Sequence, residues 1–309
     1  MKLIIQIPCY NEEETLAKLL KSLPKKLNGI KKIEYLLIND GSTDNSVKVA
    51  KKNGIHHIVS HVSNKGLAKT FMTGISKSLS LKADVIVNID ADNQYDASYI
   101  QNLIDPIVKQ SFDIAIGERP INQMTDFSYA KKKLQRIGSW FVRLMSGTNI
   151  PDTTSGFRAY SKSAAEQINI FTDYTYTLES IIQAGQKNMS IANVKIKVNP
   201  VKRKSRLVKS IPHYIFYSII TVFRVYIIYK PLKFFFFIGL ILFFAGFCIG
   251  VRWLLLIYLF GDPGRTYIPS LILASILLIM GFQTIILSFL GELFSINRRL
   301  LEKIKSKLN

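Results

Sequence analysis

The sequence predicts an α/β fold: a mostly parallel sheet flanked by helices, then an interfacial amphipathic helix and two transmembrane helices. Three observations support this prediction. Short β-rich apolar runs alternate with helical patterns up to about residue 160, which is typical of βαβ units. An aromatic, apolar stretch with sparse cations follows at 211–233. Two long apolar runs come last, at 234–260 and 268–291.

The expected strands are short apolar runs separated by helical patterns. They are LIIQI (3–7), EYLLIN (34–39), HHIVSH (56–61), ADVIVNI (83–89) and FDIAIG (112–117). Helical segments and a further strand-like run, SIANVKIKVN, follow between about 161 and 200. Ligands of parallel sheets bind beyond the carboxyl ends of the strands. The polar motifs that follow these runs are therefore the candidate site.

Each of the two long apolar runs exceeds the roughly 20 residues that cross a bilayer. The stretch before them contains His213, Arg224 and several tyrosines, so an interfacial helix is preferred to a third buried span, which remains the alternative. Cations gather on the flanks of the two runs, namely Lys230, Lys233, Arg298, Arg299, Lys303, Lys305 and Lys307. The positive-inside rule then predicts cytoplasmic termini and a multi-pass protein of the cell inner membrane.

Composition and motif content exclude or disfavour several classes of protein. The 309 residues are 48% hydrophobic, which excludes a disordered chain, and their formal net charge is +20. That charge alone would suit nucleic-acid binding, but the cations cluster beside the spans and in the presumed cleft. Cys9 and Cys248 have no disulfide or metal-ligand spacing and fit a reducing cytoplasm. A nicotinamide-dependent dehydrogenase is disfavoured because no G-x-G-x-x-G follows the first strand.

Two acidic residues follow the fourth predicted strand. Asp90 and Asp92 stand one residue apart in NIDADNQYD. Hard divalent cations such as Mg²⁺ and Mn²⁺ take carboxylate ligands and share them with substrate phosphates. The alternative is a solvated loop or an ordinary helix cap.

Four motifs carry a resemblance to a known family. IPCYNEEETL, LLINDGSTDNS, NIDADNQYD and DTTSGFRAYS, in this order and spacing, resemble family 2 glycosyltransferases of the Rossmann-like GT-A fold. The branch they resemble is that of the polyprenyl-phosphate sugar synthases, which includes dolichol-phosphate mannose synthases. The resemblance implies a catalytic domain at 1–210, juxtamembrane interfacial helices at 211–233, two membrane helices within 234–297 and a basic cytoplasmic tail at 298–309.

The resemblance also implies donor and metal ligands. The residues expected to bind the nucleotide sugar are Pro8, Tyr10, Asn11, Glu12, Asp40, Gly41, Ser42, Lys65, Gly66, Asp90 and Ala91. The Mg²⁺ or Mn²⁺ ligands are expected to be Asp90, Asp92 and Gln94, followed by Tyr95, which departs from the family's usual residue. Without the family resemblance, Gly41 and Ser42 are also consistent with a plain turn. Lys65 and Gly66 are equally consistent with an N-terminal helix cap.

On the acceptor side, the resemblance points to basic residues. Those expected to bind the acceptor phosphate are Arg119, Lys131, Arg136 and Arg206. The residues assigned to catalysis are Asp92, Arg119, Arg136, Ser155, Arg203 and Arg206. Arg158, in the same motif as Asp152 and Gly156, is expected to be structural and paired with an acid. The alternatives are a surface salt bridge for Arg119 and a lipid-attracted basic patch for 202–209.

The implied activity is inverting transfer of one sugar from a UDP- or GDP-hexose to undecaprenyl or dolichyl phosphate at the cytoplasmic membrane face. The product would serve cell-envelope glycan synthesis or protein glycosylation. Its partners would be the nucleotide sugar, the lipid and the membrane, without nucleic acid, and a homo-oligomer stays open. A processive polysaccharide synthase is disfavoured because QRIGSW lacks the Q-x-x-R-W spacing. A non-enzymatic membrane scaffold is the other alternative.

Overall fold

The computed structural model describes residues 1–121, 129–171, 176–199, 219–220, 223–224, 226–258 and 268–308. They form two compact units, Met1–Phe223 and Arg224–Asn309. Of the interfacial helix expected at 211–233, residues 211–218, 221–222 and 225 lie outside the described residues. Residues 259–267, between the two expected membrane helices, also lie outside them.

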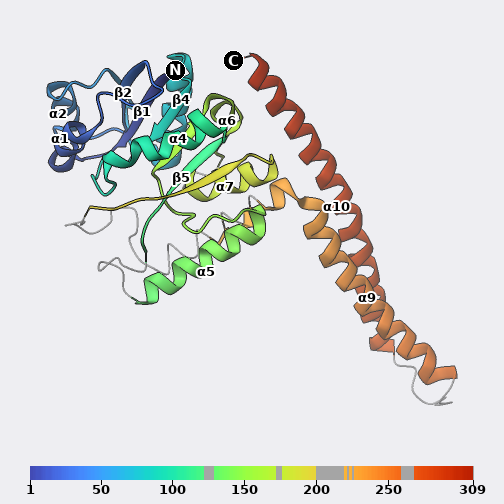
Figure 1. The fold of residues 1–309 in the computed structure, drawn as a ribbon. Helices are drawn as coiled ribbons and strands as arrows, with labels where there is room; N and C mark the ends of the chain where they lie inside the picture. The colour runs from blue at the N-terminus through green and yellow to red at the C-terminus, as the bar shows by residue number, and fades with distance from the viewer. Residues whose placement is uncertain are drawn as a thin grey trace. The chain divides into compact units, whose positions relative to one another are not determined.

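The first unit is built on a seven-stranded sheet (Figure 1). Its strands are β1 (Lys2–Cys9), β2 (Lys32–Asn39), β3 (His57–Ser60), β4 (Val85–Asn88), β5 (Ile114–Glu118), β6 (Arg158–Ser161) and β7 (Ile191–Lys195). They lie in the order β3-β2-β1-β4-β6-β5-β7, and only the two pairs that involve β6 are antiparallel. The mostly parallel α/β sheet is therefore confirmed. The antiparallel strand β6 was not expected. It lies within DTTSGFRAYS (152–161), which was interpreted as the acceptor-side motif and not as a strand.

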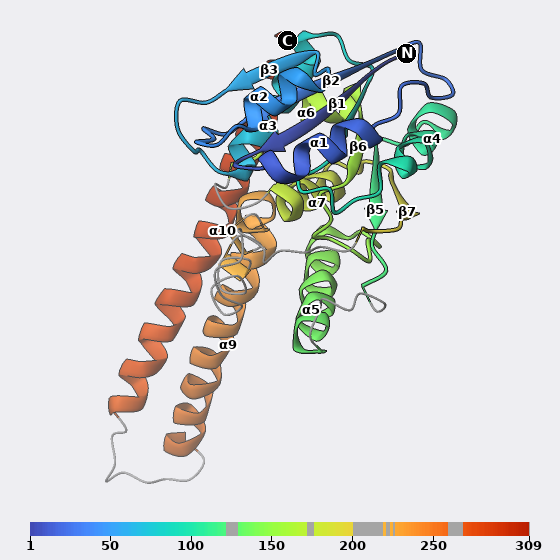
Figure 2. The same ribbon diagram turned by 90° about the vertical axis from the view of Figure 1, so that its left-hand side faces the viewer.

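Helices cover both faces of this sheet (Figure 2). They are α1 (Glu13–Ser22), α2 (Ser46–Lys52), α3 (Leu67–Ser80), the 3₁₀ turn η1 (Ala97–Tyr99), α4 (Ile100–Gln110), α5 (Tyr129–Ser146), α6 (Lys162–Gln167) and α7 (Tyr176–Gln186). On β1, Ile5 belongs to the core cluster that includes α1 and α4. Its neighbour Gln6 faces Gly74 of α3 on the other side. Burial on both faces explains why β1 is a nearly continuous apolar run.

The second unit consists of two long apolar helices, α9 (Pro231–Tyr258) and α10 (Ile268–Leu308). Both are long and apolar enough to cross a membrane, which confirms the two predicted helices. At about 1.5 Å per residue, the 41 residues of α10 span about 60 Å, or about twice the hydrocarbon layer of a bilayer. The last basic residues, expected as a separate tail, continue this helix.

Candidate active site

The loops that carry the predicted motifs meet at one edge of the sheet. β1, β2 and β4 are parallel to one another. β5 runs in the same direction, because it and β4 are both antiparallel to β6. The carboxyl ends of these four strands therefore lie together, as expected for a ligand site in a parallel sheet.

The loops after β1 and β2 are tied to each other by hydrogen bonds. The backbone N–H of Asn11 donates to Ser42 Oγ at 3.0 Å, and the N–H of Thr43 donates to Asn11 Oδ1 at 2.8 Å. Glu12 donates its N–H to Ser46 Oγ at 2.8 Å. Asn11 adopts a left-handed φ of 54°, which asparagine tolerates better than most residues. The turn that carries Pro8, Tyr10 and Glu12 is thus fixed by the second loop.

Asp40 is buried at the end of β2 and organises the start of α3. Its carboxylate accepts the backbone N–H groups of Lys65 at 2.9 Å and Gly66 at 3.0 Å. It also lies 2.7 Å from His61 Nδ1. The backbone amides of Lys65 and Gly66, two residues expected to bind the nucleotide sugar, therefore donate to Asp40. Next to it, Gly41 has a φ of 71° and no room for a side chain, since a Cβ would lie 2.7 Å from the backbone of the 63–64 segment.

The loop after β4 holds the three expected metal ligands. Asp92 Oδ1 accepts the N–H of Gln94 at 3.0 Å. Asp90 Oδ1 is enclosed and has no hydrogen-bond partner among the described residues. Burial and the charge of Asp92 raise the pKa of Asp90 to about 7, against the opposing charges of Arg119 and Arg158. Two carboxylates and an amide would offer only oxygen ligands, and the unpartnered buried oxygen of Asp90 fits a hard divalent cation.

The acceptor-side motif packs directly on this loop. A Cβ at Gly156 would lie 2.6 Å from Asp90 Oδ2 and 2.9 Å from the Tyr176 hydroxyl. The backbone N–H of Gly156 donates to the Tyr95 hydroxyl at 2.9 Å, and the Tyr95 ring stacks on Phe157 at 5.3 Å between centroids. Glycine at 156 therefore lets the backbone approach Asp90, and Tyr95 holds it there.

A network of hydrogen bonds among buried polar side chains holds Gly156 in place. Asn88 Nδ2 donates to the carbonyl of Gly156 at 2.9 Å and to the Tyr176 hydroxyl at 2.8 Å. Gln6 Nε2 donates to Asn88 Oδ1 at 2.9 Å. These side chains are fully buried, so the cost of leaving any of them unpaired is high.

Arg119, at the end of β5, forms a buried ion pair with Asp152. Its Nε donates to Asp152 Oδ2 at 2.7 Å, and Nη2 donates to Oδ1 at 2.9 Å and to Thr154 Oγ1 at 2.7 Å. Burial raises the pKa of Asp152, but the charge of Arg119 and its hydrogen bonds outweigh this and lower it. The pair is buried, unlike the surface salt bridge considered as the alternative. It fixes the orientation of the guanidinium.

The structure describes only some of the other residues predicted on the acceptor side. Ser155 is buried, and its Oγ has no hydrogen-bond partner in the described part of the chain. Arg136 is exposed on α5. The Lys131 side chain, Arg203 and Arg206 lie outside the described residues, so their roles stay predictions.

Among the described residues, Arg158 does not pair with the acid that was expected. Its guanidinium donates to the carbonyls of Thr153, Ser155 and Thr177 and to Ser180 Oγ, at 2.7 to 2.9 Å. In this fully buried position, the fixed carbonyl dipoles stabilise the cation. Arg158 is structural, as expected, and holds the acceptor-side loop to α7.

Comparison with known proteins decides the family. The model of glycosyl transferase family 2 matches residues 4–168, just over half of the chain. The chain belongs to glycosyl transferase family 2. This glycosyltransferase is 31% identical to the UDP-N-acetylglucosamine–dolichyl-phosphate N-acetylglucosaminyltransferase of Methanococcus voltae, over 62% of the chain and 83% of the relative. It is 27% identical to the undecaprenyl-phosphate mannosyltransferase of Micrococcus luteus, over 55% and 70%.

A solved structure supports the fold of the transferase. The glucosyl-3-phosphoglycerate synthase of Mycobacterium tuberculosis, in complex with Mn²⁺, UDP and glucosyl-3-phosphoglycerate, superposes with a TM-score of 0.57. The match covers 72% of this chain and 79% of that protein at 15% identity. With the family match, this confirms the GT-A fold and sets aside the non-enzymatic scaffold.

Sequence reasoning missed several residues of the transferase site. Asn88, Tyr176 and Gln6 were not among the predicted residues, and no role was assigned to Tyr95. Gln6 carried a signal, because a polar side chain in an otherwise apolar strand needs a buried partner. The contacts of Tyr95 and Tyr176 join segments distant in the chain, so no local pattern identifies them.

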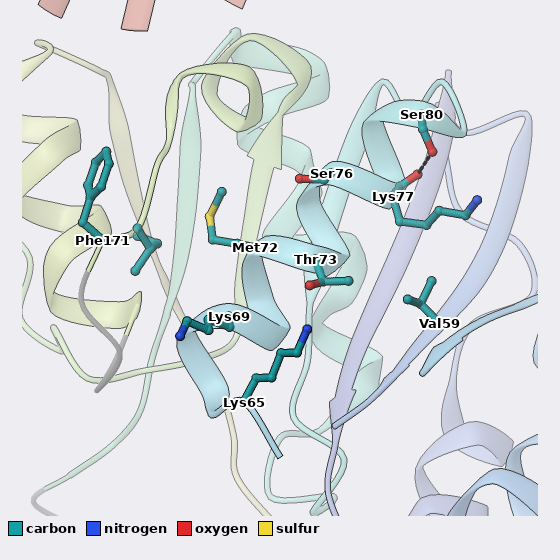
Figure 3. Close-up of a pocket in the computed structure, with 10 residues that line it drawn as sticks. Val59, Lys65, Lys69, Met72, Thr73, Ser76, Lys77, Ser80 and Phe171 are labelled. Carbon is teal, nitrogen blue, oxygen red and sulfur yellow. Dashed lines mark hydrogen bonds between the residues drawn. The ribbon is translucent and has the colours of Figure 1, made fainter. Parts of the chain in front are cut away.

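A hollow of about 660 Å³ lies along the outer face of α3 (Figure 3). Lys65 and Lys69 line it near the start of α3, and Phe171 lines it from another segment. Lys65 is the one predicted site residue in its lining. The strand-end loops, and not this hollow, therefore define the candidate site.

Proposed function

We propose that this glycosyltransferase moves a single hexose from a UDP- or GDP-sugar to a polyprenyl phosphate, undecaprenyl or dolichyl, with inversion at the anomeric carbon. The observation that carries the proposal is that two helices long enough to cross a membrane follow a family 2 domain. The relatives named for dolichyl-phosphate and undecaprenyl-phosphate transfer support a lipid phosphate as the acceptor.

Asp90, Asp92 and Gln94 would hold the Mg²⁺ or Mn²⁺ ion. The oxygen-only ligand set and the enclosed, unpartnered oxygen of Asp90 support this assignment. The presence of Mn²⁺ with UDP in the structurally similar synthase agrees with it. When bound, the cation neutralises the diphosphate that leaves the sugar.

The loops after β1 and β2 would hold the nucleoside. These two loops are joined by hydrogen bonds and contain Asn11, Glu12, Gly41 and Ser42. Pro8, Tyr10, Asp40, Lys65, Gly66 and Ala91 complete the proposed donor set. Asp40 contributes in part by fixing the amides of Lys65 and Gly66.

The transfer step needs no general base. The second pKa of a phosphate monoester is about 6, so the lipid phosphate is mostly a dianion at neutral pH. One of its oxygens bonds to the anomeric carbon as the bond from that carbon to the diphosphate oxygen breaks. Arg119, oriented by Asp152, would bind the acceptor phosphate, together with Lys131, Arg136 and Arg206. Ser155 and Arg203 would complete the reacting centre.

The proposed location is the cytoplasmic face of the inner membrane, with both termini in the cytoplasm. The flanking lysines and arginines support this orientation through the positive-inside rule. The lipid-linked sugar would then be available for cell-envelope glycan synthesis or protein glycosylation.

The proposal is tested with the full chain purified in detergent. It is supplied with undecaprenyl phosphate and a panel of radiolabelled UDP- and GDP-sugars, with Mg²⁺, with Mn²⁺ or with EDTA. The expected result is a product that extracts into organic solvent, forms from one donor and disappears with EDTA. Donor hydrolysis without a lipid product, or a product that forms equally in EDTA, would contradict the proposal.

A further inference from the structure

Helix α5 has one face bound to the candidate site. Gln135 Nε2 donates to Asp152 Oδ1 at 3.1 Å and to Thr154 Oγ1 at 3.0 Å. A hydrogen bond of 3.1 Å joins the hydroxyls of Ser139 and Thr153, and Val142 on the same face is buried. The helix is thus fixed to the loop that orients Arg119.

The opposite face of α5 exposes large apolar side chains. Ile137, Trp140 and Leu144 are between 52% and 60% exposed. Their spacing of three and four residues places them on one stripe of the helix. Figure 2 shows α5 beyond the sheet, on the side of β5 and β7. A contiguous stripe of this kind on a soluble surface marks an interaction site.

A second segment continues this apolar surface. Ile219, Ile220 and Phe223 are 39% to 47% exposed. The ring of Phe223 lies 5.5 Å from the ring of Phe141 on α5. We call the six exposed residues the α5 patch; they are Ile137, Trp140, Leu144, Ile219, Ile220 and Phe223.

The surroundings of the α5 patch favour a lipid bilayer over another protein. Lys132, Arg136 and Arg143 lie on α5 beside the stripe, and cations flanking apolar side chains suit anionic headgroups. Tryptophan is enriched at the membrane interface. In the sequence, only residues 224–230 separate Phe223 from the start of α9. A candidate membrane helix therefore follows the α5 patch directly in the chain.

We propose that the α5 patch docks on the bilayer surface. Its apolar side chains would lie at the boundary between headgroups and acyl chains, and the neighbouring Lys132, Arg136 and Arg143 would lie near anionic lipid phosphates. This rests on the membrane association in the proposed function but not on the transfer chemistry. Because α5 also binds the 152–154 loop, docking would hold Arg119 and Asp152 about one helix diameter, or about 10 Å, from the headgroups. A lipid phosphate acceptor would then reach the site without leaving the bilayer.

The chain has only two tryptophans, Trp140 in the α5 patch and Trp253 in α9, which allows a direct test. The full-length Trp253→Phe variant is reconstituted in vesicles of phosphatidylcholine and phosphatidylglycerol. We expect lipids brominated near the headgroup end of the acyl chain to quench Trp140, and acrylamide in the water to quench it weakly. The Trp140→Phe variant, which keeps Trp253 within α9, is the control that brominated lipid quenches a bilayer tryptophan.

Two results would overturn the proposal. Quenching of Trp140 by acrylamide but not by brominated lipid would place the patch in water. Protection from both quenchers would place it against protein, as in a contact between two copies of the chain. Neither measurement requires catalysis, so a failure of the transfer assay alone leaves this inference standing.

A functional test uses a charge in the α5 patch. In vesicles, Leu144→Glu should raise the KM for a long-chain polyprenyl phosphate about tenfold, because the glutamate opposes insertion. The kcat, and the activity on a short water-soluble acceptor, should stay within about twofold. Val62→Glu, a change at an exposed residue outside the patch, is the matched control. An equal KM for both variants would overturn the proposal.

Discussion

At the residue scale, Tyr95 joins the two halves of the candidate site. Its hydroxyl accepts the N–H of Gly156, and Gly156 in turn packs on the carboxylate of Asp90. No side chain would fit between Gly156 and this carboxylate, so we expect a shift of this glycine to move Asp90. Tyr95 is therefore a positioning residue for the proposed metal site.

Replacing Tyr95 with Phe keeps the ring that stacks on Phe157 but removes the acceptor of a buried N–H. An unsatisfied buried donor costs about 1–3 kcal/mol. We expect the metal concentration for half-maximal binding to rise about tenfold in a Mn²⁺ titration of the UDP-bound protein. Tyr160→Phe is the matched control, since Tyr160 is equally buried and its hydroxyl has no hydrogen-bond partner among the described residues. Equal metal affinity in the two variants would show that Tyr95 does not position the site.

The raised pKa of Asp90 predicts that stabilisation of the protein by a metal ion depends on pH. Burial and Asp92 raise this pKa from 3.8 to about 7, so its contribution to the stability of the metal-free protein is full below about pH 4 and is lost as the pH rises through about 7. A metal binds the ionised form and replaces the lost proton. The increase in melting temperature on adding Mn²⁺ should therefore be larger at about pH 8 than at about pH 6. An increase that does not change with pH would exclude Asp90 as the titrating ligand.

The sequence motifs located the residues of the candidate site, but they did not indicate which side chains pair with one another. The motifs identified Asp90, Asp92, Arg119 and Asp152, and each stands at the strand-end edge of the sheet or in the loop that packs there. The Arg119–Asp152 pair joins residues 33 positions apart in the chain. No periodicity or spacing indicates such a pair, because only the tertiary fold brings the two residues together.

At the element scale, β6 explains why the predicted sheet was incomplete. It has four residues, Arg158 to Ser161, three of them buried, so it shows no alternation of apolar and polar side chains. Its register places Arg158 opposite Asn88, which brings the acceptor-side motif to the end of β4. The strands with longer apolar runs, such as β1 and β2, were predicted because both of their faces are buried.

The second unit depends on close contact between α9 and α10. A Cβ at Gly281 would lie 2.5 Å from the backbone N of Phe243 on the facing helix. Small residues at such positions allow helix backbones in membranes to approach closely. The length and apolar character of these helices could be read from the sequence, but their contact seam could not.

Gly281→Ala should therefore separate the two helices and destabilise the hairpin by about 1–3 kcal/mol. Gly250→Ala is the matched control, because a Cβ at Gly250 meets no atom within 4 Å and alanine favours a helix. Thermal unfolding of both full-length variants in detergent measures the difference. Equal melting temperatures would contradict the close contact at Gly281.

At the scale of the whole molecule, charge and hydropathy follow the division into units. The formal net charge of +20 comes from cations outside the apolar runs, and the two helices long enough to span a membrane lie in the second unit. Composition and patterning therefore predicted a basic α/β domain followed by membrane helices. The donor sugar depends on pocket contacts that no sequence pattern specifies.

The central claim is that the acids after β4 serve a metal-dependent transfer of sugar to a lipid phosphate. The most direct measurement compares Asp92→Asn with Asp96→Asn in the assay for organic-extractable product. Both changes remove one negative charge from the same loop, but Asp96 accepts the N–H of Ser98 at 2.9 Å and caps η1. We predict that Asp92→Asn lowers product formation at least about a hundredfold while the protein stays folded, and that Asp96→Asn stays within about fivefold of the natural chain. Near-normal product formation by Asp92→Asn would contradict the account.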